Sequence, residues 1–382
     1  MLRALSWILS FVGVVQFVRL SNKGRATLWV ENLEPKIRKK WIRRKFFPPV
    51  LVAINSVEYP STALAETYSK QVVLINSQYQ GRFGEALHFL LDHWPLPKLG
   101  PYRLLRRPGS SFEMPSWADR RGSTHEMKRL LEAMGLDPMK DFVLLSVRDA
   151  SYYELLQRRT NIVPGPETSS NTFVRNPDIE SYYRVVRSLR DSGIHVLRFG
   201  IVDSSLPDLL RGIVVDYSID FRSPHRDLLL GQHCLAMLSG ASGAWCFASM
   251  FNRPVVYTNL LHRVLAGVSP RDRFIPQLLF SEKRRRLLTF EELFSTAGRY
   301  SYADNCANDG IRPVANTPEE LQEVAFEALN LDSELIDSTG DDALLHDAFR
   351  KIANRFSIQP KHMALSRGRI GTRFLRRYRE LL

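Results

Sequence analysis

The sequence predicts an α/β protein in which helices cover both faces of parallel β-sheets. Short apolar runs alternate with segments of helical spacing, and this alternation is typical of βαβ units. The runs are rich in Val, Ile and Leu and lack a regular polar alternate, as expected of strands that are buried on both faces. The length, 382 residues, suits two compact domains better than one.

In the first part of the chain, the apolar run Val72–Asn76 is the clearest predicted strand, and it reads as a buried parallel strand. The elements expected after it are a glycine-bearing turn at 80–85, a helix over 86–94, a loop over 95–122 and a helix over 124–134.

The second half of the chain alternates regularly between strands and helices. Asn176 and Pro177 predict a helix start, with Asn176 as N-cap and Pro177 at the first helical position, and Gly193 ends that helix. The other expected elements are strands over 142–147, 195–199, 212–216, 235–238 and 254–257, a helix from the turn at 239–243 to residue 251, and helices near 290–297, 318–330 and 341–355.

This pattern divides the chain into four parts. Residues 1–66 form a lead-in segment and 67–140 an N-terminal Rossmann-like domain, which is reduced unless residues 26–66 contribute to it. Residues 141–340 form a C-terminal domain, and 341–382 form basic C-terminal helices. We expect the last of these, near 360–382, to return to the first domain or to the membrane.

The net charge of +13 is concentrated at the two ends of the chain. Residues 1–50 hold eleven Lys and Arg against two Glu, and residues 361–382 hold seven against one, whereas 51–360 sum to −2. Basic ends on a near-neutral body indicate an anionic partner, either a membrane surface or a nucleic acid. The three cysteines are odd in number and widely spaced, which excludes a disulfide framework and offers no pair of metal ligands.

The first fifty residues favour the membrane. The run from Ala4 to Val18 is apolar except for three residues, yet it is shorter than the ~20 residues that span a bilayer as a helix. Seven of the ten residues from Lys36 to Lys45 are basic, and Trp41 and Ile42 lie among them. Basic residues beside aromatic and apolar ones fit an interfacial anchor on an anionic leaflet. The alternatives are a solvated basic helix and an arm on nucleic acid; we expect the membrane, because phosphate alone gives the aromatic residues no contact.

The strongest chemical signal is a small-residue turn between a predicted strand and a helix. Its residues Ser239, Gly240, Ser242 and Gly243 allow a phosphate group to approach the backbone, and the helix N-terminus favours an anion. A tight turn with a serine N-cap and no ligand explains the pattern equally well.

A second signal is the placement of arginines near strand ends. Arg148 follows the strand at 142–147, and Arg198 lies near the end of the strand at 195–199. Because ligands bind at the carboxyl ends of parallel strands, these guanidinium groups suit a diphosphate, and Arg175 is a third candidate. The alternative for each arginine is a solvated charge or a structural ion pair.

Glu85 closes the turn Gly81-Arg82-Phe83-Gly84 and is expected at the N-terminus of the helix that follows. A carboxylate there could remove the proton of an acceptor hydroxyl. Stabilisation of the helix dipole is the competing explanation.

Several short motifs between residues 140 and 260 together resemble a known family. They are Val147-Arg148-Asp149 with Tyr152, Arg175-Asn176-x-Asp178-Ile179 with Tyr182, Val196-x-Arg198-x-Gly200, Val215-Asp216-Tyr217, Asp227, Ser239-Gly240-x-Ser242-Gly243, and Phe251-x-x-Pro254 with Asn259. This set resembles a bacterial glycosyltransferase family associated with surface polysaccharide synthesis, distantly similar to fucosyltransferases and heptosyltransferases. In similar fucosyltransferases an arginine after this strand binds the donor diphosphate, which implies that role for Arg148. Those enzymes have a histidine where this chain has Ser146, so the sugar stays unassigned.

The resemblance implies a GT-B architecture, in which an acceptor-side domain and a nucleotide-sugar-binding domain face a cleft. The implied activity is metal-independent transfer of a sugar from a nucleotide-sugar donor to a glycan or lipid-linked acceptor, with no cofactor and no nucleic-acid partner. Arg148 and Glu85 are the implied catalytic residues, since the turn before Glu85 is similar to turns of heptosyltransferases and fucosyltransferases. The implied location is cytoplasmic, peripheral on the inner face of the cytoplasmic membrane. The competing hypothesis is a non-catalytic protein that binds sugar nucleotides or nucleic acid.

Overall fold

The computed structural model describes three strands in the first part of the chain and most of the chain from residue 123 onwards. The described ranges are 15–19, 50–55, 72–76, 123–148, 176–202, 204–240, 242–249, 251–260, 267, 269–296, 299–301, 303–331, 340–356 and 368–382. The chain divides into two compact units, Met1–Ser111 and Phe112–Leu382. The division falls earlier than the predicted boundary at 140, so the helix expected over 124–134 belongs to the second unit.

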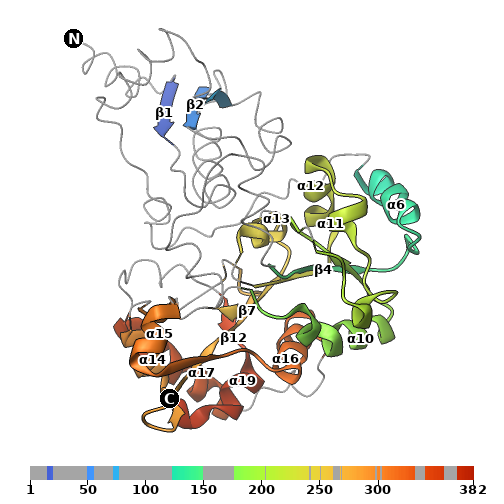
Figure 1. The fold of residues 1–382 in the computed structure, drawn as a ribbon. Coiled ribbons are helices and arrows are strands. Elements are labelled where there is room, and N and C mark those ends of the chain that lie inside the picture. The colour runs from blue at the N-terminus through green and yellow to red at the C-terminus, as the bar shows by residue number, and fades with distance from the viewer. Residues whose placement is uncertain are drawn as a thin grey trace, which may run out of the picture. The chain divides into compact units, whose positions relative to one another are not determined.

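The first unit contains a three-stranded parallel sheet in the order β1-β2-β3 (Figure 1). Its strands are β1 (Val15–Arg19), β2 (Val50–Asn55) and β3 (Val72–Asn76). The strand predicted at Val72–Asn76 is confirmed, and so is its parallel pairing. The end of the first apolar run is a sheet strand, and residues 26–66 supply β2, so the sheet begins well before residue 67. The basic run at 36–45 lies outside the described residues.

The second unit is built on a six-stranded parallel sheet in the order β12-β8-β7-β6-β4-β5. Its strands are β4 (Phe142–Ser146), β5 (His195–Arg198), β6 (Ala236–Ser239), β7 (Val255–Leu260), β8 (Arg273–Pro276) and β12 (Arg369–Ile370). Every residue of β4 and β6 is buried, which confirms that these apolar runs are strands covered on both faces. In Figure 1, α12 and α13 lie on one side of β4, and α10 and α16 lie on the other.

The helices of this unit follow the predicted order, with several short additions. They are α6 (Ser123–Ala133), α10 (Tyr183–Asp191), α11 (Tyr217–Asp220), α12 (Pro224–His233), α13 (Cys246–Ser249), α14 (Phe290–Ser295), α15 (Ala303–Asp309), α16 (Pro318–Leu329), α17 (Gly340–Phe356) and α19 (Thr372–Arg377). Short 3-10 helices are η2 (Ile179–Tyr182), η3 (Asp208–Leu210), η4 (Gly243–Trp245), η5 (Arg299–Ser301) and η7 (Arg379–Leu381). The segment 212–216 forms only isolated bridges instead of the expected strand.

The start of the helix after residue 176 differs from the prediction. Asp178, and not Asn176, is the N-cap, because its side chain accepts a hydrogen bond from the N–H of Glu180. A 3-10 turn comes first, and α10 begins at Tyr183. Two capping side chains close together in sequence compete for one helix start, and the acidic one is used here.

A second, antiparallel sheet in the order β10-β9-β11 was not predicted. Its strands are β9 (Leu278–Ser281), β10 (Arg286–Leu287) and β11 (Ile311–Val314). They are short, and the edge strand β11 carries Arg312 and Pro313, so neither length nor alternation marks them in the sequence.

The C-terminal segment 368–382, which we expected to return to the first domain or to the membrane, packs on the second unit. β12 pairs with β8, and α19 contacts α16 and α17. Arg376 forms a two-pronged ion pair with Asp342, whose side chain is almost fully buried. The Glu327 carboxylate accepts hydrogen bonds from the backbone N–H and the hydroxyl of Thr372. The basic charge of this segment is therefore partly used to fasten the end of the chain.

No helix among the described residues is long and apolar enough to cross a membrane.

Candidate functional site

The order of the strands places a candidate ligand site between β4 and β6. The connection from β4 leads to β5 on one side, and the connection from β5 returns to β6 on the other side of β4. Adjacent parallel strands whose connections diverge leave a crevice at their carboxyl ends, where open α/β sheets bind ligands. Ser146 and Ser239 end the two strands and lie opposite each other in the register. The predicted turn and Arg148 therefore follow the two strands that flank this position.

The turn that follows β6 is tied to β4 by the backbone. The N–H of Gly240 donates to the carbonyl oxygen of Ser146 at 3.1 Å, and the N–H of Ser242 donates to the carbonyl of Gly240 at 2.7 Å. The Ser239 hydroxyl donates to the carbonyl of Gly240 at 3.1 Å and lies 3.4 Å from the Ser242 hydroxyl. Both serine side chains thus lie at the carboxyl end of β6, where Ser239 is fully buried and Ser242 is partly exposed.

Ser242 also acts as the capping serine that the alternative explanation, a tight turn without a ligand, predicts. Its hydroxyl accepts a hydrogen bond from the N–H of Ala244 at 3.3 Å, as a capping serine does. The helical segment beyond it consists of η4 and α13, which ends at Ser249 and not at 251. A helix this short contributes little dipole, so attraction of an anion would depend mainly on the serine hydroxyls and on Arg148.

The two glycines of the turn leave room for a ligand. A Cβ added to Gly243 would meet no heavy atom within 4 Å, and one added to Gly240 would come no closer than 3.9 Å to the ring of Pro177. Pro177 therefore lies against the turn at Gly240. Asn176 directly precedes Pro177 in the sequence. The Oδ1 atom of Asn176 is buried and has no hydrogen-bond partner in the described part of the chain.

Asn176 is a candidate site residue that the sequence did not indicate. We expected it to cap a helix, but Asp178 occupies that role, and an acceptor oxygen of Asn176 remains available beside the turn. A buried acceptor without a donor is costly unless a ligand or water supplies one. The signal in the sequence is the presence of Asn176 in the family-like motif.

Arg148 is buried at the carboxyl end of β4, with 7% of its surface exposed. Arginine is rarely buried this deeply without a structural or binding role. Its position after β4 places it at the same end of the sheet as the turn. Asp149 and Tyr152, which accompany it in the motif, lie outside the described residues, as do Arg175 and Glu85.

Arg198 has a structural role in this fold. Its guanidinium donates to the carbonyl oxygen and hydroxyl of Ser204 at 2.7 and 2.9 Å and to Asp216 Oδ2 at 3.1 Å. Burial raises the pKa of Asp216, and the charge of Arg198 opposes that rise. These contacts hold the loop after β5, as the ion-pair alternative expected, so the guanidinium is committed to protein groups.

Two further residues of the family-like motif are also structural. The Tyr217 hydroxyl donates to Asp227 Oδ1 at 2.8 Å, and Arg222 donates to Asp227 Oδ2 at 2.8 Å. Asp227 is buried, and this network satisfies both of its oxygens. The network fixes α11 against α12 on the flank of the sheet.

The carboxyl end of β7 is closed by buried polar side chains. The Tyr182 hydroxyl lies 2.6 Å from the Thr258 hydroxyl, and burial raises the pKa of Tyr182. Asn259 and Asn316 bind each other through reciprocal bonds from backbone N–H to side-chain oxygen, of 2.5 and 2.8 Å. Asn259 has a φ of +49°, a conformation that asparagine tolerates better than most residues. These hydrogen bonds join the carboxyl end of β7 to Tyr182 and Asn316, next to β6 in the sheet.

Next to this cluster, the Gln277 Oε1 atom follows β8 and is buried without a hydrogen-bond partner in the described part of the chain. The described residues contain no cluster of three or more His, Cys, Asp or Glu side chains that could hold a metal ion.

No family model matches the chain, and no curated protein matches it. Among solved structures, it is similar to a glycosyl transferase of family 9 from Veillonella parvula, with 9% identity and a TM-score of 0.38 over 64% of this chain and 79% of that one. It is also similar to the ADP-heptose lipopolysaccharide heptosyltransferase II of E. coli, with 15% identity and a TM-score of 0.34 over 72% and 82%.

A third similar structure is TibC, a dodecameric iron-containing heptosyltransferase in complex with ADP-D-β-D-heptose. The identity is 12% and the TM-score 0.31, over 64% of this chain and 57% of that one. Similarity at these levels carries no conclusion about what this chain binds or transfers.

Proposed function

We propose that this protein is a glycosyltransferase that moves a sugar from a nucleotide-sugar donor to a glycan or lipid-linked acceptor. The observation that carries the proposal is that Arg148 and the turn at 239–243 follow two adjacent strands, β4 and β6, at the switch point of the six-stranded sheet. A crevice at this place in an open parallel sheet suits a nucleotide. The resemblance in the motifs of 140–260 supports the same conclusion.

The donor diphosphate is assigned to the serine hydroxyls and to Arg148. Ser242 offers a donor, Ser239 would have to release its bond to the Gly240 carbonyl to offer one, and Gly240 and Gly243 leave space for phosphate oxygens. The positive charge of Arg148 would stabilise the nucleoside diphosphate as it leaves, without a metal. Asn176 Oδ1 would accept a hydrogen bond from a hydroxyl or amine of the donor. Arg198 is left out, because its guanidinium already binds Ser204 and Asp216.

Glu85 and Arg175 complete the proposal from the sequence alone. Glu85 acts as the base that takes the proton of the acceptor hydroxyl, and Arg175 is a further phosphate ligand. The first unit, with its parallel sheet of β1–β3, is the acceptor side of a GT-B architecture. We further propose that the enzyme serves surface polysaccharide synthesis from the inner face of the cytoplasmic membrane, held by its basic N-terminal segment.

Ligand-dependent melting tests the donor site. UDP, GDP, ADP, CMP and dTDP are added in turn to the full-length protein, and one of them should raise the melting temperature. A ligand at about 100 times its Kd stabilises the folded state by about 2.7 kcal/mol. An unchanged melting curve with all five would reject the donor site.

Gly243→Val is the variant that separates binding from folding. The added side chain begins in open space, so the free protein should melt near the wild-type temperature. The same side chain would fill the space assigned to phosphate and should remove the ligand-induced shift. Gly135→Val is unsuitable as its control, because Gly135 has a φ of +71°, whereas no positive φ is found at Gly243.

A further inference from the structure

The hairpin of β9 and β10 carries the densest basic sequence among the described residues. Ser281 pairs with Arg286, and the loop between them holds Glu282 followed by Lys283, Arg284 and Arg285. All residues from Glu282 to Arg286 are exposed. We refer to residues 281–287 as the basic hairpin. Four consecutive cations at the tip of a hairpin form a compact positive surface.

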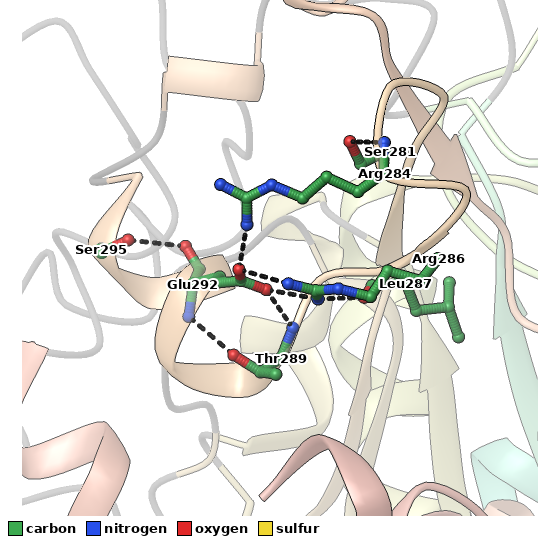
Figure 2. Close-up of polar contacts among 7 residues, drawn as sticks. All are labelled: Ser281, Arg284, Arg286, Leu287, Thr289, Glu292 and Ser295. Carbon is green, nitrogen blue, oxygen red and sulfur yellow. Dashed lines mark hydrogen bonds and ion pairs between the residues drawn. The ribbon is translucent and has the colours of Figure 1, made fainter.

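The basic hairpin is fastened to the N-terminus of α14. Figure 2 shows the Glu292 carboxylate between Arg284 and Arg286, close to the N-cap residue Thr289. Glu292 accepts two hydrogen bonds of 2.7 Å from Arg286 and one of 2.9 Å from the N–H of Thr289. Hydrogen bonds from Arg286 lower the pKa of Glu292 to about 2, so it is ionised at neutral pH. The hairpin is therefore tied to α14 through Glu292.

The carboxylates near the basic hairpin do not cancel its charge. Glu292 is shared by Arg284 and Arg286, and Glu282 forms an ion pair with Arg312 at 3.1 Å. Among the described residues, Lys283 and Arg285 have no ion pair within 4.0 Å. Nearby Asp309 is paired with Arg299. The surface thus keeps a net positive charge, with Lys283 and Arg285 at its tip.

The backbone of Arg285 supports a role for its side chain. Its φ is +55°, in the left-handed region where glycine or asparagine is the usual residue of a turn. An arginine in this conformation is strained by the backbone. A hairpin that served only stability would gain from glycine here, which favours a use for the arginine side chain.

We propose that the basic hairpin is a docking surface for the phosphate headgroups of an anionic lipid bilayer. Lys and Arg near such a surface are attracted by its negative potential, and Lys283 and Arg285 at the tip can approach it together, with Arg284 and Arg286 behind them. Nucleic acid fits less well. Phe280, the aromatic residue next to the hairpin, is only partly exposed, and the Arg312 guanidinium lies over its ring at 5.1 Å. No open ring is offered there for base stacking.

Sedimentation of the full-length protein with vesicles tests this surface. The vesicles contain either phosphatidylcholine alone or phosphatidylcholine with about 30% phosphatidylserine. The wild type should bind only the anionic vesicles. The double variant Lys283→Gln/Arg285→Gln should bind them about thirtyfold more weakly. Its melting temperature should match the wild type, since both side chains are exposed and unpaired in the described structure.

The matched control is Arg129→Gln/Lys140→Gln, which removes one arginine and one lysine from exposed positions in and after α6. In Figure 1, α6 lies far from α14, the helix that holds the basic hairpin. The control should bind anionic vesicles within about twofold of the wild type. Equal binding by the hairpin variant, or an equal loss in the control, overturns the proposal. Absence of vesicle binding by the wild type, with RNA binding that the hairpin variant weakens, overturns it in favour of nucleic acid.

Discussion

The C-terminal segment 368–382 and the basic hairpin use the same kind of charge in opposite ways. In the C-terminal segment, Arg376 meets the buried Asp342, and Arg377 meets Glu323 at 2.9 Å. In the hairpin, the carboxylates are few and shared, and the cations at the tip face solvent. The difference teaches that a basic run acquires its role from the acidic residues the fold brings to it, and a count along the sequence does not reveal them.

The largest expected effect is the loss of the C-terminal ion pair. Arg376→Ala removes the two-pronged ion pair with the buried Asp342, so the free energy of unfolding should fall by about 3 kcal/mol. Urea unfolding measures this change. Arg379→Ala removes an exposed arginine a few residues further on and should change stability by less than about 0.5 kcal/mol. Equal, small effects in both variants would show that the C-terminal charge is solvated like that of the hairpin.

In the main sheet, Arg148 and Arg198 are expected to differ in the same way, with Arg198 paired to a carboxylate and Arg148 assigned to a ligand. Arg148→Ala should weaken nucleotide binding by about 1.5–3 kcal/mol, the contribution of a charged hydrogen bond, while the protein stays folded. Arg198→Ala leaves Asp216 without its buried partner, so it should lower the melting temperature instead. Titration calorimetry and thermal melting of both variants separate the two roles. A destabilised Arg148→Ala protein with intact affinity would place Arg148 in the structural group.

The pH dependence of stability sharpens the description of the C-terminal segment. His346 in α17 lies 3.1 Å from the Thr372 hydroxyl, and burial lowers its pKa from 6.5 to about 4, with Arg369, Arg273 and Arg350 adding to the shift and Asp342 opposing it. Between these values the unfolded chain binds more protons than the native protein at this site. The contribution to stability is therefore full above pH 6.5 and is lost as the pH falls towards 4.

His346→Gln keeps a hydrogen-bonding side chain and removes the titration. Urea unfolding between pH 4 and pH 7 should give a shallower pH dependence for this variant than for the wild type. Parallel curves for the two proteins would mean that His346 is solvated in the native state and that the C-terminal segment is loosely packed.

The smallest expected effect concerns the fastening of the basic hairpin. Glu292→Gln removes the charge that holds Arg284 and Arg286 and weakens the capping box of α14, so stability should fall by about 1 kcal/mol. Glu282→Gln, whose ion pair with Arg312 is exposed on both sides, should have a smaller effect. The difference should disappear towards pH 2, where Glu292 becomes protonated. Equal effects at neutral pH would show that the hairpin is not fastened.

The main sheet could be predicted because its strands are short apolar runs, and such runs indicate buried parallel strands. The strands β4 and β6 are buried along their whole length, and Arg148 and the turn at 239–243 follow them at the same end of the sheet. The positions of β1 and β2 could not be predicted, since the apolar run before Val18 and the segment 26–66 fit several structures equally well.

The missed features depend on partners that are distant in sequence. Asp216 lies 18 residues from Arg198, and Asp342 lies 34 residues from Arg376. No local pattern indicates that such residues meet, so the sequence alone left the choice between phosphate ligand and ion pair open. The prediction of Asn176 as N-cap is wrong for a local reason, because the side chain of Asp178 competes with it for the same helix start.

Because β1 is an edge strand of the first sheet, deletion of the N-terminal segment is a poor test of its proposed binding to the membrane. A shortened chain that begins after residue 47 lacks β1, and the hydrogen-bonding edge of β2 is then uncovered along five paired residues. Uncovered strand edges recruit other chains and cause aggregation. Aggregates sediment with or without lipid, so the aggregated deletion variant would seem to bind vesicles even if it does not. Substitution of the basic residues at 36–45 within the intact chain avoids this artefact.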